Sequence, residues 1–543
     1  MLLLFRACLV GVFVGVWFAS AQSIWVVAPT GGPVGPGENT SLTEALAAPP
    51  DKFVPTLFFA IVFWILFFGI EAIRTLRKSG FLVEIRQLLG VAITALFFTA
   101  LYQLFEPDYH WWMGIVTLLI AVPYFALFRM VRGKGETSQL VLGRYVLIAV
   151  ALLFTATAIH FYGFTTAMLW SLEAVVVIYF GLQWNMKSMW SAAIVMFAFA
   201  FFKLFFSEGF MQYQPLEEFR LLLNRRALAF AIVGTSMLVG TELFRRKGEQ
   251  LAAAFGRLLT YVACLVVFAL ISAETSDLFE RRMLYVDGSA TLYLAFKRDL
   301  SLAVVWMAYS LLLAIVGFRR NQNAYLHSSI VVLALSILLG VFRSLSFDPI
   351  EQHSLLVNYR VLVLIVLAVG CVRHAWWWRR EGKEMKWSGA FLKGIGLSIV
   401  VIIFVLLTSE VLDFFNQRII AAQSQISADS TVADSERIES YRNLQELWIS
   451  GVWLFYSIVM LVAGIWKRFR ALRIIAIILF GITILKIFIF DLSFLETLYR
   501  IISFMGLGVI LLGVSYLYQK YKGIILDTEG DKPVASAAGE TQQ

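Results

Sequence analysis

The chain has 543 residues, of which 60% are hydrophobic and only 15% are charged. Soluble globular domains are about half apolar and about a quarter charged, so this composition excludes an ordinary water-soluble protein. The net charge of +9 would suit nucleic-acid binding, but in membrane proteins basic residues gather in cytoplasmic loops, and their distribution here follows that rule. We therefore expect an integral membrane protein that binds no nucleic acid.

Apolar runs of about 20 residues recur along the chain, and each is long enough to cross a bilayer as a helix. Backbone groups in lipid must bond internally, and these runs lack the alternation of a β-barrel strand. We predict an all-α, polytopic transmembrane helical bundle of about sixteen helices. The expected segments are 3–22, 53–73, 84–105, 111–130, 143–161, 164–182, 190–207, 226–244, 252–272, 299–318, 325–345, 359–378, 390–411, 447–466, 471–490 and 498–518.

The two ends of the chain differ from the rest. Arg6, a short apolar stretch and Ala19-Ser20-Ala21 resemble a signal peptide with its cleavage site. Residues 1–22 equally fit an uncleaved first membrane helix, and in both cases the Gly- and Pro-rich linker 23–52 is exported. At the other end, residues 523–543 are polar and predict a disordered cytoplasmic tail.

The connections between segments alternate in charge. Clusters of Lys and Arg follow most even-numbered segments, beginning at Arg74, Arg129, Arg245, Arg319, Arg379, Lys467 and Lys520. The intervening connections are mostly acidic and begin at Glu106, Glu208, Glu274, Asp348, Asp429 and Asp491. Because basic loops stay in the cytoplasm during insertion, the alternation places the C-terminus inside the cell. The long outer loop 416–446 is expected to form short exposed helices.

Three stretches of the chain share a pattern. Each has a Trp followed eleven residues later by a Gly, at Trp170 and Gly181, Trp306 and Gly317, and Trp453 and Gly464. The next segment carries a cation and then an acid five residues later, at Lys203 and Glu208, Arg343 and Asp348, and Lys486 and Asp491. The final segment of each unit opens with an arginine, at Arg225, Arg360 and Arg500.

These patterns predict repeats of four helices. SAETSDLF at 272–279 also matches TSEVLDFF at 408–415. An even number of helices preserves orientation, so the repeats are expected to be parallel. We predict repeat 1 at 139–250, repeat 2 at 251–386 and repeat 3 at 387–522, with the N-terminal membrane helices of 53–138 as a candidate diverged repeat.

The C-terminal stretch WKRFRALRIIAIILFGITILKIFIFDLSFLETLYRIISFMGLGVILLGVSYLYQKY resembles the end of a bacterial family of predicted multi-pass membrane proteins, domain of unknown function 2339. SAETSDLF and the Trp-to-Gly stretches resemble the same family, so the resemblance covers residues 140–522. It implies a protein of the bacterial inner membrane with many helices, and it implies no activity.

Ten charged residues near the predicted outer helix ends are the candidate substrate-binding residues. Glu274 and Asp277 are three residues apart, and so share a helix face, as do Glu410 and Asp413. An ionisable group at the centre of a membrane helix costs about 2.5–3.5 kcal/mol, so some interaction must offset that cost. The candidates are Glu274, Asp277, Arg343, Asp348, Arg360, Glu410, Asp413, Lys486, Asp491 and Arg500.

Three explanations of these charges remain open. The first is internal pairing, of Asp348 with Arg360 and of Asp491 with Arg500, which would join one repeat to the next. The second is an outer-leaflet polar pocket for an anionic headgroup, a sugar phosphate or an ion. The third is catalysis by carboxylates, as in polyprenyl-phosphate-sugar-dependent glycosyltransferases.

Metals and cofactors are not indicated. The five histidines are scattered and show no metal-ligand spacing, and the three cysteines form no CxxC pair. No phosphate-binding loop sequence is present. We therefore expect no metal and no cofactor, with catalytic residues left unassigned.

Three functions follow from the three explanations. Transport or handling of a lipid, glycan precursor or other envelope component predicts that several charges converge on one cavity. A glycosyltransferase-like enzyme predicts a deep cavity with a single unpaired acid. A structural membrane partner without its own substrate predicts paired charges and no cavity. Membrane lipids, and an envelope glycan or lipid precursor, are the expected partners, and enzyme activity stays undecided.

Overall fold

The computed structural model of the chain describes residues 50–76, 83–133, 139–206, 213–346, 354–382, 388–424, 432–487, 489 and 497–520. The regular secondary structure in these ranges is helical, which confirms the all-α prediction. Twelve of the described helices are long and apolar enough to cross a membrane. The predicted segment 3–22, the linker up to residue 49 and the tail 523–543 lie outside the described residues.

The chain divides into two compact units, Met1–Glu274 and Thr275–Gln543, and the division falls inside α9 (Gln250–Met283). Unit 1 also contains α3 (Pro50–Leu76), α4 (Val83–Arg132), α5 (Gln139–His160), α6 (Gly163–Gln183), α7 (Lys187–Phe205), η1 (Leu216–Glu218) and α8 (Arg225–Lys247). Unit 2 also contains α10 (Ser289–Arg320), α11 (Asn323–Leu345), α12 (Tyr359–Glu381), α13 (Ser388–Ser424), α14 (Val432–Trp466), α15 (Arg470–Lys486) and α16 (Thr497–Lys520). The repeat boundaries 250/251 and 386/387 stay predictions.

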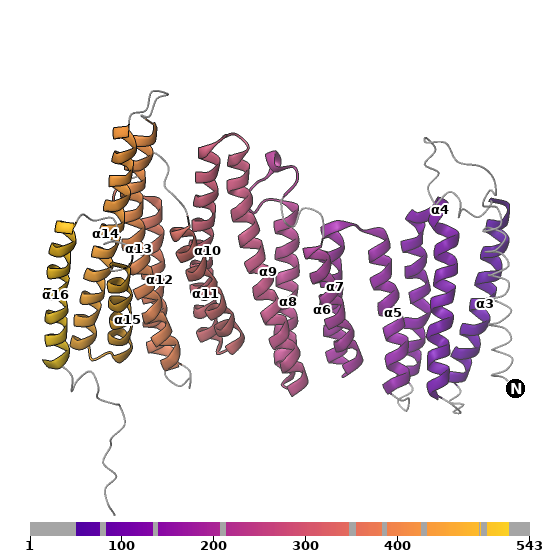
Figure 1. Ribbon diagram of the computed structural model, residues 1–543. Helices are drawn as coiled ribbons and strands as arrows, with labels where there is room; N and C mark the ends of the chain where they lie inside the picture. The colour runs from indigo at the N-terminus through magenta and orange to yellow at the C-terminus, as the bar shows by residue number, and fades with distance from the viewer. Residues whose placement is uncertain are drawn as a thin grey trace, which may run out of the picture. The chain divides into compact units, whose positions relative to one another are not determined.

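Helix α4 consists of two antiparallel arms, although its 50 residues are helical throughout (Figure 1). The hydroxyl groups of Thr94 and Tyr124 lie 2.6 Å apart. In a straight helix these residues would be about 45 Å apart, so the chain must reverse between them. The two arms therefore correspond to the predicted segments 84–105 and 111–130.

Four helices extend further than the predicted spans. The stretch SAETSDLF continues α9, and α10 begins ten residues before the predicted segment 299–318. The expectation of separate short helices in the loop 416–446 is wrong, because α13 continues to Ser424 and α14 starts at Val432. With 37 residues, α13 is about 55 Å long, which exceeds a hydrocarbon core of about 30 Å. Its end therefore projects together with α14 (Figure 1).

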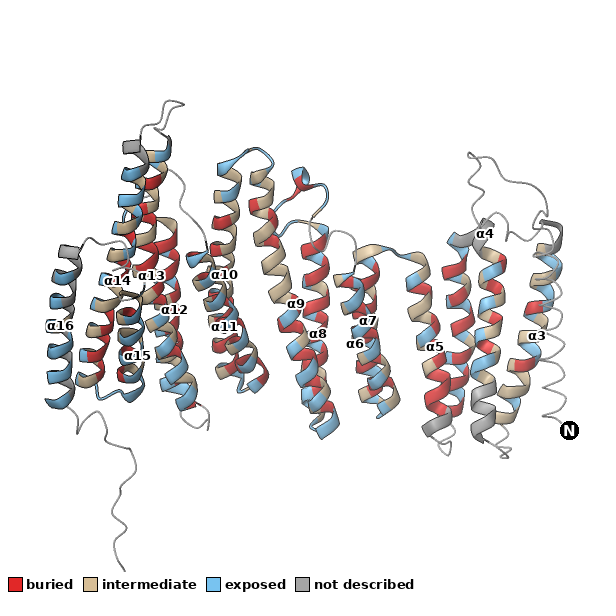
Figure 2. Cartoon of the chain, in the orientation of Figure 1, coloured by how far each residue is buried: buried red, intermediate tan, exposed pale blue. Residues whose placement is uncertain are grey.

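The helix surfaces are apolar where a soluble protein would be polar. Leu335, Leu338 and Phe342 of α11 are exposed, whereas Ser329 and Ser336 of the same helix are buried (Figure 2). Ser329 exchanges hydrogen bonds with Ser310 of α10, and Ser336 donates to a carbonyl group of α10. Polar groups packed between helices and leucines facing outward are the pattern expected in lipid.

The three Trp-to-Gly stretches end in the same turn. Each glycine carbonyl accepts a hydrogen bond from the backbone N–H five residues later, at distances of 2.9, 3.0 and 2.9 Å for Gly181, Gly317 and Gly464. The residue four positions after each glycine is left-handed, with φ of 55°, 51° and 52°. This arrangement is a Schellman motif, which satisfies the last carbonyl groups of α6, α10 and α14. The turn then leads directly into the next helix.

Each of these glycines also allows that next helix to approach closely. A Cβ atom at Gly181 would lie 2.9 Å from Met189, one at Gly317 would lie 2.6 Å from Leu326, and one at Gly464 would lie 2.8 Å from Arg473. Real Cβ atoms almost never come that near to another heavy atom. The glycines of the sequence pattern are therefore explained by tight packing of α6 on α7, α10 on α11 and α14 on α15.

We expect Gly317→Ala to destabilise the protein by about 1–3 kcal/mol, because the added methyl group overpacks the contact with Leu326. The measurement is unfolding of the purified full chain in detergent by a denaturing detergent. Gly394→Ala in α13 is the matched control, since a Cβ atom at Gly394 would meet nothing within 4 Å. Equal stability of the two variants would contradict a close approach at Gly317.

Candidate functional site: carboxylates at helix ends

Glu274 of α9 holds the loop that precedes α8. Its carboxylate accepts hydrogen bonds from the backbone N–H of Leu222 at 2.7 Å and from the side-chain amide of Asn224 at 2.9 and 3.0 Å. The Nη2 of Arg226 donates a further bond at 2.8 Å. Glu274 and Arg226 are 2% and 0% exposed, so the ion pair is closed to solvent. We call Leu222, Asn224, Arg226 and Glu274 the first clamp.

The loop before α12 is held in the same way by two acids of α13. Glu410 accepts from the backbone N–H of Leu356 at 2.7 Å and from the side-chain amide of Asn358 at 2.6 Å. Asp413 accepts from Nη1 of Arg360 at 2.7 Å, and the two side chains are buried. We call Leu356, Asn358, Arg360, Glu410 and Asp413 the second clamp.

The two clamped loops share one backbone conformation. Leu222 and Leu356 are left-handed, with φ of 60° and 61°. Asn224 and Asn358 have φ of −136° and −134°, and each caps the following helix by accepting from the N–H three residues later. A left-handed leucine is strained, and its N–H bond to the glutamate is one of the contacts that hold it.

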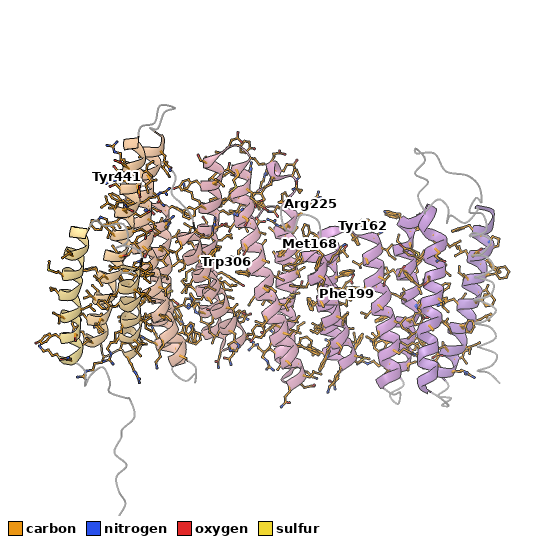
Figure 3. The ribbon with its side chains drawn as sticks, in the orientation of Figure 1. Tyr162, Met168, Phe199, Arg225, Trp306 and Tyr441 are labelled. Atoms are coloured by element: carbon orange, nitrogen blue, oxygen red, sulfur yellow. The ribbon has the colours of Figure 1, made fainter. Side chains whose placement is uncertain are left out.

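This geometry corrects the alignment of the arginines. The sequence pattern aligns Arg225 with Arg360. However, Arg225 directly follows Asn224, whereas Arg360 is two residues after Asn358. In the structure Arg226, two residues after its asparagine, forms a buried ion pair with Glu274, as Arg360 does with Asp413. Arg225 is exposed at the start of α8 (Figure 3).

The clamps explain how carboxylates are tolerated near membrane helices. A buried charge is stable only when a counter-ion and hydrogen-bond donors replace the water that it has lost. The first clamp provides an arginine, an asparagine amide and a backbone N–H for one carboxylate. The first clamp joins α8 to α9, and the second joins α12 to α13. In the predicted repeats, each clamp joins the last helix of one repeat to the first helix of the next.

Arg360 pairs with Asp413 of α13, a partner that the sequence pattern did not indicate. Asp348, Asp491 and the side chain of Arg500 lie outside the described residues, so the two predicted pairs, Asp348 with Arg360 and Asp491 with Arg500, stay predictions. Internal pairing across successive helices is what the clamp carboxylates show.

The other candidate cations have local partners within unit 2. Arg343 of α11 lies 2.7 Å from a carboxylate oxygen of Asp299 in α10. Lys486 at the end of α15 lies 2.9 Å from Oε2 of Glu446 and donates to the hydroxyl of Ser450, also at 2.9 Å. The first of these pairs lies near the second clamp, because the guanidinium of Arg360 is 5.3 Å from the ring of Phe296, one turn before Asp299 on α10. Asp277, one turn after Glu274, is fully buried in α9.

An open groove with a volume of about 290 Å³ lies between the end of α13 and the beginning of α14. Gln445 crosses it, donating to the carbonyl group of Leu412 at 3.2 Å and to Oδ1 of Asn416 at 2.8 Å. Figure 3 labels Tyr441 in this projecting part of α14. The groove is lined by Asn416, Ile419, Ile420, Gln423, Arg442, Gln445 and Glu446.

Comparison with known protein families decides the classification. Residues 3–521 match the model of a family described as Predicted membrane protein (DUF2339). The chain belongs to this family. The resemblance to domain of unknown function 2339 is thereby confirmed over almost the whole chain, and the description assigns no activity. No curated protein and no solved structure matches the chain.

Some functional residues of this DUF2339 chain are missed by sequence reasoning. The asparagines and Arg226 belong to a short pattern, Leu-x-Asn-x-Arg, which occurs at 222–226 and 356–360 and is visible in the sequence. Asp299 and Glu446 have no such signal, because each is a single acid whose partner lies on another helix. Glu173 stands within the first Trp-to-Gly stretch, where it is hidden in an apolar run.

The described residues of this DUF2339 member offer no metal site. No group of three or more His, Cys, Asp or Glu side chains comes together within the described ranges. The two described cysteines, Cys264 and Cys371, are buried and form no disulfide. The carboxylates of the two clamps are bound to arginine and amide groups instead.

Proposed function

We propose that this protein handles a polar, anionic envelope component at the groove between α13 and α14, and that its clamps are structural. The proposal is the lipid- or glycan-precursor handling expected from the sequence, with the site moved from the clamps to the groove. The observation that carries it is the polar lining of a groove on helix ends that project beyond a membrane span.

The charge of the groove favours an anionic ligand. Glu446 is neutralised by Lys486 at 2.9 Å. Arg442 is exposed and has no ion-pair partner among the described residues. One net positive charge therefore remains at the groove, carried by a guanidinium group, which binds phosphate or carboxylate oxygens through two parallel hydrogen bonds.

The remaining lining favours a hydroxylated ligand. Asn416, Gln423 and Gln445 present amide groups, which both donate to and accept from hydroxyl groups. Ile419 and Ile420 provide apolar surface beside them. A volume of about 290 Å³ is at the lower end of small-molecule sites. A sugar phosphate or a phosphorylated headgroup combines these properties.

The proposed setting is the inner membrane of a bacterium, with the groove on the exported side and the C-terminus in the cytoplasm. Support comes from the alternation of basic and acidic connections along the chain. The basic ends of α8, α10 and α12 all fall on the side predicted to be cytoplasmic. The groove lies at the opposite helix ends, where α13 ends and α14 begins.

The enzyme alternative has less support. A general base needs a carboxylate that is free to accept the substrate proton. Glu274, Glu410 and Asp413 are each engaged by arginine or amide donors. The structural alternative explains the clamps equally well, but it leaves the polar groove without a role.

The groove is tested by binding of glucose 1-phosphate to the purified full chain in lipid nanodiscs, measured by calorimetry. Arg442→Ala is expected to weaken binding about 10- to 100-fold, because one charged hydrogen-bond donor contributes about 1.5–3 kcal/mol. Glucose without phosphate should bind the wild type weakly, since it lacks the anionic group.

The matched control is Arg437→Ala, an exposed arginine of the same helix that does not line the groove. It should bind glucose 1-phosphate like the wild type. Equal affinity of the Arg442→Ala and wild-type proteins, or no binding to either, would remove the groove as the ligand site and leave the structural alternative.

A further inference from the structure

Glu173 differs from the carboxylates of the two clamps. It lies at the middle of α6, ten residues from Gly163 and ten from Gln183. Thr157 of α5 donates a hydrogen bond to its Oε1. Its Oε2 is inaccessible to solvent and has no hydrogen-bond partner among the described residues. A carboxylate oxygen without a donor is a rare and costly arrangement.

No cation compensates this carboxylate in the part of the chain that the structure describes. The helices that pack against α6 are α5, α7 and α8. None of their charged or titratable groups forms an ion pair or hydrogen bond with Glu173 in the described structure. These groups are Arg144, Tyr145, His160, Lys187, Lys203, Arg225, Arg226, Glu242, Arg245, Arg246 and Lys247. Several of them are engaged elsewhere, Arg144 with Glu71, Arg226 with Glu274 and Glu242 with Arg245.

The surroundings of Glu173 are apolar. One turn before it on α6, Trp170 stacks on Phe154 with 4.1 Å between ring centroids. Phe199 of α7, labelled in Figure 3, packs edge-on against both rings. The neighbouring Leu172 and Val176 of α6 are exposed and would face lipid. An ionised carboxylate in such a place has neither water nor a counter-ion.

The other two Trp-to-Gly stretches have a neutral hydroxyl at this position. Three residues after Trp306 and Trp453 stand Tyr309 and Tyr456, and the hydroxyl of Tyr456 donates to the carbonyl group of Val400 at 2.8 Å. Glu173 is thus the acid in a position that otherwise holds a phenol. The fold accepts a neutral hydrogen-bonding side chain here.

We propose that Glu173 is a proton-binding site within the membrane, with the proton carried on Oε2 while Oε1 accepts from Thr157. A protonated carboxyl group needs no counter-ion, which removes the largest cost of the site. A metal ion is a poor substitute, because no group of three or more His, Cys, Asp or Glu side chains gathers around this carboxyl group among the described residues. The site belongs to unit 1 and is independent of the groove in unit 2.

The first test uses the membrane-soluble reagent dicyclohexylcarbodiimide on the full chain in lipid bilayers. The acid O–H adds across one C=N bond, and the adduct rearranges to a stable N-acylurea without an oxidant or a leaving group. Peptide mapping at neutral pH should find the adduct on Glu173. Above the pH at which Glu173 loses its proton, labelling should fall about tenfold for each further pH unit.

The second test is infrared spectroscopy of the wild type against Glu173→Gln. The wild type should show the carbonyl stretch of a protonated acid, and the variant should lack it. Glu242→Gln is the matched control, because Glu242 pairs with Arg245 and Arg246 at the end of α8, and it should keep the band. If Glu173→Gln fails to fold, labelling of the wild type with the carbodiimide still decides whether Glu173 carries a proton. A wild type with neither adduct nor acid band would overturn the proposal.

Discussion

Glu274→Ala is expected to destabilise the protein by about 3–5 kcal/mol, because it breaks the buried ion pair with Arg226. The substitution also removes the acceptor of the Leu222 N–H and of the Asn224 amide. Leu222 then loses a contact that holds its left-handed backbone, so the loop before α8 should loosen as well. The measurement is unfolding of the purified full chain in detergent by a denaturing detergent.

Two variants make this result specific. Glu249→Ala removes an acid whose partner, Lys247, lies 3.6 Å away at the surface, and such a pair contributes about 0–1 kcal/mol. Glu274→Gln keeps the size of the side chain and one acceptor oxygen, so its loss should be intermediate. If Glu274→Ala were as mild as Glu249→Ala, the first clamp would have no structural role.

Arg360→Ala is the second large effect, again about 3–5 kcal/mol, because it breaks the buried ion pair with Asp413. Their side chains are only 4% and 5% exposed, so solvent cannot replace the lost partner. In the double variant Arg360→Ala/Asp413→Ala no charge remains unpaired. Its destabilisation should therefore be clearly smaller than the sum of the two single losses.

The wild type, the two single variants and the double variant form a double-mutant cycle, which is measured by the same unfolding experiment. Arg380→Ala is the control. Arg380 is an exposed residue of the same helix, paired with Glu381 at 3.3 Å, and it should change stability little. Simple additivity of the Arg360 and Asp413 substitutions would contradict their direct pairing. Normal stability of Asp413→Ala alone would show that the acid is not held as a charge.

The clamp carboxylates and Glu173 thus form two classes. In the clamps each acid has an arginine or amide donors, and its substitution is expected to affect folding. At Glu173 the acid has only Thr157, and its substitution by glutamine is expected to affect proton binding. The classes differ in position as well, since the clamps hold the starts of α8 and α12, whereas Glu173 is at the middle of α6.

Part of the site can be predicted from sequence. The acids at 274 and 410 stand out because an ionisable group beside a membrane span requires compensation. Their correct partners cannot be obtained in this way, because Glu274 contacts residues 48–52 positions away and Glu410 residues 52–54 positions away. At such a separation along the chain, several arginines are possible partners for each acid. The pairing of Arg360 with Asp413, 53 positions away, was not predicted, because the sequence pattern indicated the nearer acid Asp348.

The sequence by itself determined the membrane spans, the helical fold and the Trp-to-Gly pattern. These features are local, because the length of an apolar run decides whether a helix can cross the hydrocarbon. A close approach of two helix backbones likewise requires a small residue, so it can be recognised in the sequence as a glycine. The all-helical structure, the two arms of α4 and the turns after Gly181, Gly317 and Gly464 agree with that interpretation.

Only the tertiary structure decided which charges meet, where the groove lies and which acid lacks a partner. The pairing of charged side chains depends on how helices distant in sequence pack against one another. Neither composition nor periodicity contains that information. The polar stretches of α13 and α14 resemble a loop until the two helices are packed together. Glu173 resembles any residue of an apolar run until its Oε2 is found without a donor.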